Sequence, residues 1–403
     1  MRIAYLTTCS PVPAVSGHSL RVHANWRAFR ELAQVRTFAF DSCPPPSERT
    51  ELARLGITCL TARREARAAL LARHVRSFLR GRSMLYAKAC SPARIRRLAG
   101  ELRAWGADLL VIGDTWLADL LPELRGAARR IVVDTHNVES RLYTRIVAEQ
   151  PSPRRLKYIL FRENVRRIER RLAEADAVWA VSEADAEVYR TGQGLARVAV
   201  LPNALDTDVY TPAGTRPELG TIVFTGSYGY WPNEAAALHL IGLSGRLAAQ
   251  GLTHRMLLVG RDPSPRMLES AKAAPSVTVT GPVSDVRPFI ARAALVAAPL
   301  TSGSGTKYKL LEALAMGRPV VTTPVGAEGL DLRDGVNAAV ANDLAGFDEA
   351  VAAALREPAH AEVMAGAGRA WVVGTHSLAA LGRALRGALD ELGLSRAAPE
   401  QAA

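Results

Sequence analysis

The chain has 403 residues, of which 48% are hydrophobic and 22% charged, and its formal net charge is +12. The length allows two domains of ordinary size, and the composition is that of a globular protein rather than a disordered or fibrous one. No apolar run approaches the roughly 18 residues that a membrane-spanning helix needs. Four cysteines without C-x-x-C spacing favour reduced thiols in a cytoplasmic protein.

Short apolar runs, often rich in β-branched residues, alternate with helical patterns along the whole chain. The first of them is read as a strand and not as part of a signal peptide. This alternation predicts α/β architecture with parallel sheets, whose ligands bind beyond the carboxyl ends of the strands. The predicted strands are Ile3–Leu6, Leu109–Ile112, Ile131–Val133, Val178–Val181, Val198–Leu201, Ile222–Phe224, Met256–Val259, Val277–Val279, Leu295–Ala298 and Val320–Thr322.

The positive charge is concentrated in the first half of the chain. Residues 211–403 carry equal numbers of basic and acidic side chains, and the excess lies in segments such as Leu60–Arg103 and Arg154–Arg171. In the first segment Leu71 and Val75 belong to an apolar stripe flanked by arginines. This pattern is typical of a helix that lies on an anionic membrane surface, but also of a helix that packs on its own sheet with a solvated basic face.

A domain boundary is predicted in the aperiodic stretch Pro202–Pro217, which is rich in Pro, Asp, Thr and Gly. Beyond it, Ala294–Pro324 reads as strand, glycine-rich loop, helix, turn and strand. Backbone N–H groups at a helix N-terminus suit an anion such as phosphate, and Lys309 adds a positive charge there. Glu312, one turn into the helix, offers acceptor oxygens to a hydroxylated group. The alternative to a phosphate site is an ordinary connecting loop of an α/β domain, followed by a solvated glutamate in the first turn of the helix.

Several motifs, in this order along the chain, resemble a family 4 glycosyltransferase of the GT-B fold, in its exopolysaccharide-type sugar transferase branch. The most specific one is the block Gly305–Ala313, GTKYKLLEA, followed by Met316–Val321, MGRPVV. The other matching pieces are Asp134–Glu139, Val181–Glu183, Pro202–Asn203, Thr225–Ser227, Trp231–Asn233, Val259–Arg261 and Gly326–Leu330.

The resemblance implies two doubly wound Rossmann-like domains that face each other across a cleft. We expect an N-terminal, acceptor-side domain at 1–205 and a C-terminal domain that binds a nucleotide sugar at 206–375. A C-terminal helix is expected at 376–394 and a disordered tail at 395–403. The implied reaction transfers a sugar from a nucleotide-diphosphate sugar to an acceptor hydroxyl, with retention of configuration and without a metal or other cofactor.

The resemblance also assigns roles to residues. His136, Lys309 and Glu312 are expected to act at the reacting centre, with His136 at the donor sugar, Lys309 at the diphosphate and Glu312 at the ribose hydroxyls. The remaining residues expected to bind the donor are Gly17, in the loop Pro13–His18 after the first strand, and Gly226, Ser227, Arg261, Ser304, Gly305 and Thr306. His18 and His23, near the first loop, are interpreted as incidental.

Two departures from the family pattern weaken the inference about the donor. An acidic residue common eight positions before the glutamate is here Ser304, so the identity of the sugar cannot be carried over. The arginine and lysine usual early in the second domain are missing from Gly226–Asn233, so that Lys309 and Arg261 would have to replace them at the diphosphate.

Other functions remain open from the sequence. The pI near 10 would suit a basic nucleic-acid-binding protein, but few aromatics are interleaved with the arginines and no nucleic-acid module is recognisable. An inactive GT-B scaffold in a polysaccharide assembly complex is a further alternative. A hydrolase or epimerase of the same fold would need a base, for which His136, Asp114 and Glu139 are the candidates. The acceptor is a polysaccharide, a glycolipid or a small molecule, and the protein is expected in the cytoplasm, with an anionic membrane surface as a partner of its basic N-terminal domain.

Overall fold

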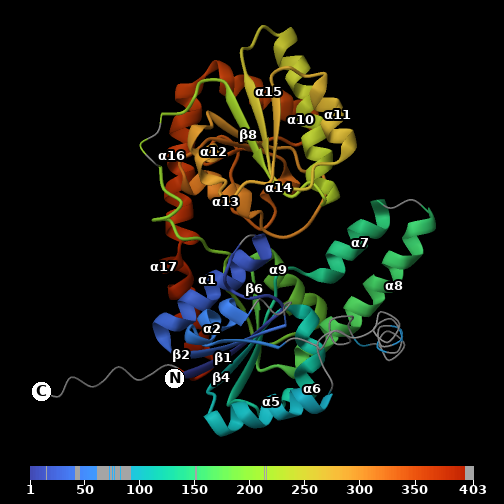
Figure 1. The fold of residues 1–403 in the computed structure, drawn as a ribbon, viewed down its shortest axis with the longest axis vertical. Coiled ribbons are helices and arrows are strands. Elements are labelled where there is room, and N and C mark those ends of the chain that lie inside the picture. The colour runs from blue at the N-terminus through green and yellow to red at the C-terminus, as the bar shows by residue number, and fades with distance from the viewer. Residues whose placement is uncertain are drawn as a thin grey trace, which may run out of the picture. The chain divides into compact units, whose positions relative to one another are not determined.

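The computed structural model describes residues 1–14, 16–40, 46–60, 72, 75, 77, 82, 92–149, 152–212, 214 and 216–394 (Figure 1). They form two compact units. The N-terminal unit comprises Met1–Ala204 and the chain from Leu381 onward, and the C-terminal unit comprises Leu205–Ala380. Each unit contains one parallel sheet with helices around it, so the predicted α/β fold is confirmed.

The N-terminal unit contains a seven-stranded sheet in the order β3-β2-β1-β4-β5-β6-β7. Its strands are β1 (Arg2–Thr7), β2 (Gln34–Ala39), β3 (Ile57–Cys59), β4 (Leu109–Gly113), β5 (Arg130–Asp134), β6 (Ala177–Ala180) and β7 (Val198–Val200). Its helices are α1 (Gly17–Leu32), α2 (Pro46–Arg54), α5 (Pro92–Trp105), η1 (Thr115–Leu120), α6 (Leu121–Leu124), α7 (Glu139–Glu149), α8 (Ser152–Glu169), η2 (Arg170–Glu174), α9 (Glu183–Glu187), η3 (Val188–Gly192) and most of α17 (Leu378–Glu391).

The C-terminal unit contains a six-stranded sheet in the order β10-β9-β8-β11-β12-β13. Its strands are β8 (Thr221–Thr225), β9 (Arg255–Val259), β10 (Val277–Gly281), β11 (Leu295–Ala298), β12 (Val320–Thr322) and β13 (Ala339–Val340). Its helices are α10 (Trp231–Ala249), α11 (Pro265–Lys272), α12 (Arg287–Arg292), α13 (Tyr308–Ala315), α14 (Pro324–Ala327), α15 (Leu344–Arg356) and α16 (Pro358–Thr375).

Burial of both sheet faces explains why the strands read as continuous apolar runs. Every residue of β4, and every residue of β8, is buried, as expected of parallel strands covered by helices on both sides. The ten predicted strands correspond to β1 and to β4 through β12. The sequence missed β2, β3 and β13, which are short or carry polar residues.

A buried ion pair connects α1 to the sheet of the N-terminal unit. Arg21 is 2% exposed and Asp134, at the end of β5, is fully buried. Both guanidinium and carboxylate have further partners, because Arg21 also donates to the Leu201 carbonyl and to Asn203 Oδ1, at 3.0 Å each, and Asn25 donates to Asp134. Burial raises the pKa of Asp134, and the neighbouring Arg21 opposes that rise.

The helices α7 and α8 pack side by side and extend from the N-terminal unit as a pair (Figure 1). The predicted basic segment Arg154–Arg171 falls largely on α8. Most of the other segment, including Leu71 and its neighbours, lies outside the described residues, as does the predicted tail at 395–403. Within the part of the chain that is described, no helix is both long enough and apolar enough to cross a membrane.

Candidate active site

Each sheet has one point at which the chain changes direction across it. In the N-terminal unit this point lies between β1 and β4, and in the C-terminal unit between β8 and β11. Open parallel sheets bind ligands just beyond the carboxyl ends of the strands at such a point. Functional side chains are therefore expected on the loops that follow β1, β4, β8 and β11.

The loop after β11 has the backbone of an anion-binding loop. Gly303 and Gly305 adopt φ angles of 110° and 71°, which are unfavourable for residues with a Cβ. Among the described residues, the hydroxyl oxygens of Ser302 and Thr306 are buried without a hydrogen-bond partner. The helix α13 then begins without a side-chain cap at its N-cap residue, Lys307. The positive end of the helix dipole and the two buried hydroxyls are therefore suited to an anionic ligand.

Lys309 lies one residue inside α13 and reaches the end of β8. Its Nζ donates to Asn233 Oδ1 at 2.7 Å and lies 4.2 Å from the centre of the Phe224 ring. Burial lowers the pKa of Lys309 to about 7, against the favourable effect of nearby Glu312. A Cβ on Gly226 would come within 3.2 Å of the lysine Nζ and 3.1 Å of Asn233. The amine is thus held close to the backbone that follows β8.

Glu312 is 8% exposed and accepts a hydrogen bond at 3.2 Å from the hydroxyl of Tyr210. Burial raises the pKa of Glu312 to about 7, while Tyr210 and Lys309 both favour its charged form. Because two groups with opposite charge titrate in the same range, they are best treated as a pair.

The other predicted residues of the C-terminal unit gather at the ends of β8 and β9. The backbones of Gly226 and Gly260 are in contact, since a Cβ on Gly260 would lie 1.7 Å from the Gly226 carbonyl oxygen. Arg261 donates to Ser227 Oγ at 3.4 Å and is also paired with Asp262 at 3.6 Å. This arginine is 56% exposed, so its ion pair contributes little to stability. Ser304 is half-buried in the glycine-rich loop.

In the N-terminal unit, Gly17 does not lie in a loop as the sequence suggested. It is the first residue of α1, which begins there because Ser16 and Ser19 form a capping box. His136 follows β5, as expected. Burial lowers the pKa of His136 well below its usual value, and His18 and Arg21 lower it further. This imidazole is therefore neutral at pH 7.

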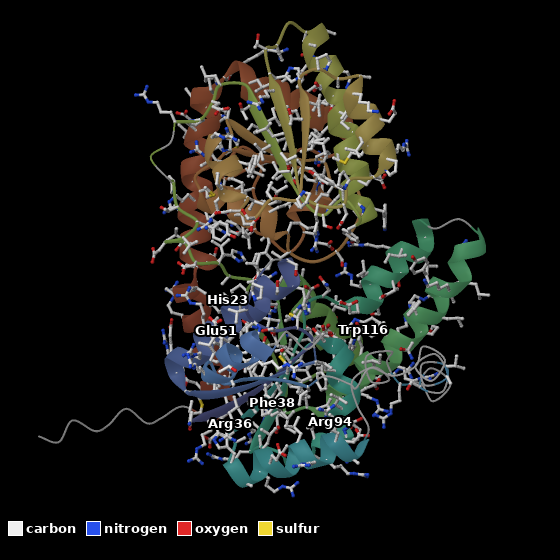
Figure 2. All side chains as sticks on the ribbon, viewed as in Figure 1. His23, Arg36, Phe38, Glu51, Arg94 and Trp116 are labelled. Atoms are coloured by element: carbon white, nitrogen blue, oxygen red, sulfur yellow. The ribbon has the colours of Figure 1, made fainter. Side chains whose placement is uncertain are left out.

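In the structure Thr8, His18 and Asp114 lie close to His136, a grouping that the sequence does not predict. The rings of His18 and His136 are 4.3 Å apart, centre to centre. Thr8 Oγ1 lies 2.6 Å from His18 Nε2 and donates to Asp114 at 3.4 Å. Asp114 also caps η1 by accepting from the Trp116 amide. His23 lies outside this group, because its Nδ1 hydrogen-bonds to the Pro11 carbonyl. Figure 2 labels His23 and Trp116.

Glu139, also named as a candidate base, begins α7 close to this group. Burial and the nearby Asp114 raise the pKa of Glu139 to about 8, while hydrogen bonds from Asn137 and Trp116 lower it. This carboxyl group is therefore largely protonated at pH 7 and can donate a hydrogen bond. An ordinary glutamate at a helix N-terminus would be ionised, so the sequence alone gave no sign of this state.

Comparison with known proteins agrees with the geometry of both units. The family model described as Glycosyltransferase Family 4 matches residues 17–209, and the one described as Glycosyl transferases group 1 matches residues 220–357. A comparison with curated proteins finds no match.

Solved structures of similar fold cover almost the entire chain. Sucrose-phosphate synthase of Thermosynechococcus elongatus has a TM-score of 0.75 at 17% identity, over 97% of this chain and 99% of its own. HepE of Anabaena has a TM-score of 0.68 at 15% identity, over 97% and 100%. TarM of S. aureus has a TM-score of 0.69 at 10% identity, over 97% and 100%. The chain therefore belongs to the family 4, group 1 glycosyltransferases and is a glycosyltransferase of the GT-B fold.

Proposed function

We propose that this glycosyltransferase takes its sugar from a nucleotide-diphosphate sugar and transfers it to an acceptor hydroxyl with retention of configuration. The reaction needs no metal ion. The observation that carries the proposal is the Lys309–Glu312 pair beneath the glycine-rich loop, at the point where the sheet of the C-terminal unit changes direction. HepE structures have been solved with UDP and with UDP-glucose, which supports a donor of this class.

The chemistry explains why a lysine belongs at this place. The bond between sugar C1 and the diphosphate oxygen breaks, the bond between C1 and the acceptor oxygen forms, and the proton of the acceptor hydroxyl passes to the departing diphosphate. Negative charge then develops on the diphosphate, and preorganised donors stabilise it most effectively. The Lys309 ammonium, the amides of Gly305 and Thr306, and the hydroxyls of Ser302 and Thr306 supply such donors. These donors would stabilise the charge on the diphosphate in place of a divalent metal ion.

The remaining roles are those that the resemblance to the family implies. Glu312 accepts from the ribose hydroxyls, and Gly226, Ser227 and Arg261 line the diphosphate side. His136, whose imidazole is neutral, is expected to contact the donor sugar, and Gly17 is expected to contact the diphosphate. The acceptor is a polysaccharide, a glycolipid or a small molecule. We place the protein in the cytoplasm, with the basic N-terminal unit against an anionic membrane surface when the acceptor is a lipid.

The donor site is tested by thermal unfolding with UDP, GDP, dTDP, ADP and their common sugars, without added metal and with EDTA present. A ligand at 100 times its dissociation constant stabilises the native state by about 2.7 kcal/mol, which corresponds to roughly 5 to 10 °C for a domain of this size. We expect such a shift with one nucleotide. If no nucleotide raises the melting temperature, the inactive-scaffold alternative is favoured.

Replacing Glu312 by glutamine should weaken the binding of that nucleotide by about 10- to 100-fold, because a charged acceptor of ribose hydroxyls is lost. Glutamine retains an oxygen that can accept from Tyr210, so the unit should stay folded. Isothermal titration calorimetry measures the affinity, and Glu349→Gln, on the exposed face of α15, is the matched control. Equal affinity in Glu312→Gln and wild type would exclude the ribose role.

The affinity for the nucleotide sugar should fall as the pH rises from about 6 to about 8. Lys309 has a pKa of about 7, so it loses its positive charge, which would face the diphosphate, over this range. The diphosphate of a nucleotide sugar has no titrating phosphate monoester and keeps its charge. In Lys309→Met most of the fall should disappear. An affinity that rises with pH in the wild type would show that another group controls binding.

A further inference from the structure

Three side chains of the N-terminal unit form a cluster of ligand atoms for a metal ion. They are His18 at the start of α1, Asp114 after β4 and His136 after β5, and one ligand atom from each lies within 4.8 Å of the other two. Two imidazole nitrogens and one carboxylate oxygen form the ligand set of zinc sites that keep an open fourth position. We propose that this cluster binds a zinc-class transition-metal ion, and that the bound ion inhibits the enzyme.

The surroundings of His136 fit a metal ligand. Its imidazole hydrogen-bonds to the Gly113 backbone, which is the kind of outer partner that orients metal-binding histidines. The other nitrogen, Nε2, is buried and has no hydrogen-bond partner among the residues that the structure describes. A buried polar atom without a partner costs free energy, and coordination would satisfy it.

Asp114 is held in a way that leaves one oxygen for an ion. Its Oδ1 accepts from the Trp116 amide at 2.8 Å, which fixes the carboxylate at the start of η1. Its Oδ2 faces the Thr8 hydroxyl at a long 3.4 Å. This oxygen, on a carboxylate that is 7% exposed, is only weakly engaged and can therefore accept a cation.

His18 completes the cluster with only a small movement. Its ring is 4.3 Å from that of His136, and Thr8 Oγ1 lies 2.6 Å from its Nε2. Metal–nitrogen bonds of about 2.0 Å in a tetrahedral site place ligand atoms about 3.3 Å apart. Side-chain rotation can close the gap from 4.8 Å. The Thr8 hydroxyl, which is able to rotate, then serves as an outer hydrogen-bond donor to the Asp114 carboxylate.

The expected consequence for transfer rests on the proposed function. There His136 presents its free nitrogen to the donor sugar, and a coordinated ion would occupy that nitrogen. The diphosphate charge is balanced in the C-terminal unit by Lys309, so the reaction itself gains nothing from the ion. A zinc-class ion is therefore an inhibitor and not a cofactor.

The test is a titration of the full chain, without a polyhistidine tag, with Zn²⁺ against a chromophoric chelator and with Co²⁺ by visible absorption. We expect one equivalent to bind and Co²⁺ to give the intense spectrum of a four-coordinate site. His18→Asn, Asp114→Asn and His136→Gln should each weaken binding at least about tenfold. His23→Asn changes a histidine that lies on α1, like His18, but outside the cluster. This control variant should bind the metal ion as tightly as the wild type.

Circular dichroism and thermal unfolding establish that each variant is folded, and Asp114→Asn keeps an oxygen that can cap η1. The proposal is overturned if the wild type binds no stoichiometric ion, or if the three cluster variants bind as tightly as His23→Asn. Stoichiometric binding without loss of transfer activity would overturn the inhibitory role alone. If no nucleotide sugar is turned over at all, the proposed function fails while the titration still decides on the site.

Discussion

Replacing Lys309 by methionine is expected to slow sugar transfer by about 10²- to 10³-fold, the effect of removing one strong donor to a developing negative charge. The lysine Nζ lies against the Phe224 ring and donates to Asn233, so it has a fixed position from which to reach the diphosphate. Methionine fills a similar volume and removes a cation whose burial is unfavourable. The variant should therefore stay folded and lose rate rather than stability.

This expectation is measured as initial rates at saturating donor, with the nucleotide sugar that the thermal screen identifies. Lys272→Met is the control, because Lys272 is 74% exposed and paired with Glu269 on α11. Most of the loss should fall on kcat, since the charge develops in the transition state. A rate equal to that of Lys272→Met would mean that the loop amides stabilise the diphosphate without the lysine.

The Arg21→Met substitution is expected to destabilise the N-terminal unit by about 3 to 5 kcal/mol, the usual result of removing one partner of a buried ion pair. Asp134 would keep the donor Asn25 but lose its charge partner in a fully buried place. The segment Leu201–Asn203 would lose two hydrogen bonds from the guanidinium as well. The pair therefore connects three parts of the chain that are distant in sequence.

Urea unfolding followed by far-ultraviolet circular dichroism measures this effect. Arg30→Met is the control on the same helix, because Arg30 is exposed and covers the Trp26 ring, a contact worth about 0.5 to 1 kcal/mol. Combining Arg21→Met with Asp134→Leu should restore much of the stability, since no unpaired charge would remain. If Arg21→Met unfolds at the same urea concentration as Arg30→Met, the network is not a stabilising element.

Much of the fold could be predicted because parallel strands buried on both faces leave an unmistakable pattern. The strands Leu109–Gly113 and Thr221–Thr225 are apolar or small throughout, and this pattern predicts strands at Leu109–Ile112 and Ile222–Phe224. The strand β2, QVRTFA, lacks a continuous apolar run, because its first three residues are exposed or half-buried. It could therefore not be predicted in the same way. The two-residue β13 is defined only by its pairing with β12, which no local pattern reveals.

The candidate site was predicted unevenly for a similar reason. The block Gly305–Glu312 is contiguous, so its loop, lysine and carboxylate could be recognised together, and their roles remain predictions. Tyr210, which donates to Glu312 from 102 residues away, could not be found in this way. Gly17 was placed in a loop because the capping of α1 depends on the geometry of Ser16 and Ser19.

The sequence by itself determined the strand–helix alternation, the family motifs and the anion-binding character of one loop, since each of these is a local property of neighbouring residues. Only the tertiary structure decided that Thr8, His18, Asp114 and His136 share one edge of a sheet. Thr8 and Asp114 are 106 residues apart, and the order of strands in the sheet, not any local preference, brings them together. Burial, which sets the pKa values of Lys309 and Glu139, is likewise created only when the chain has folded.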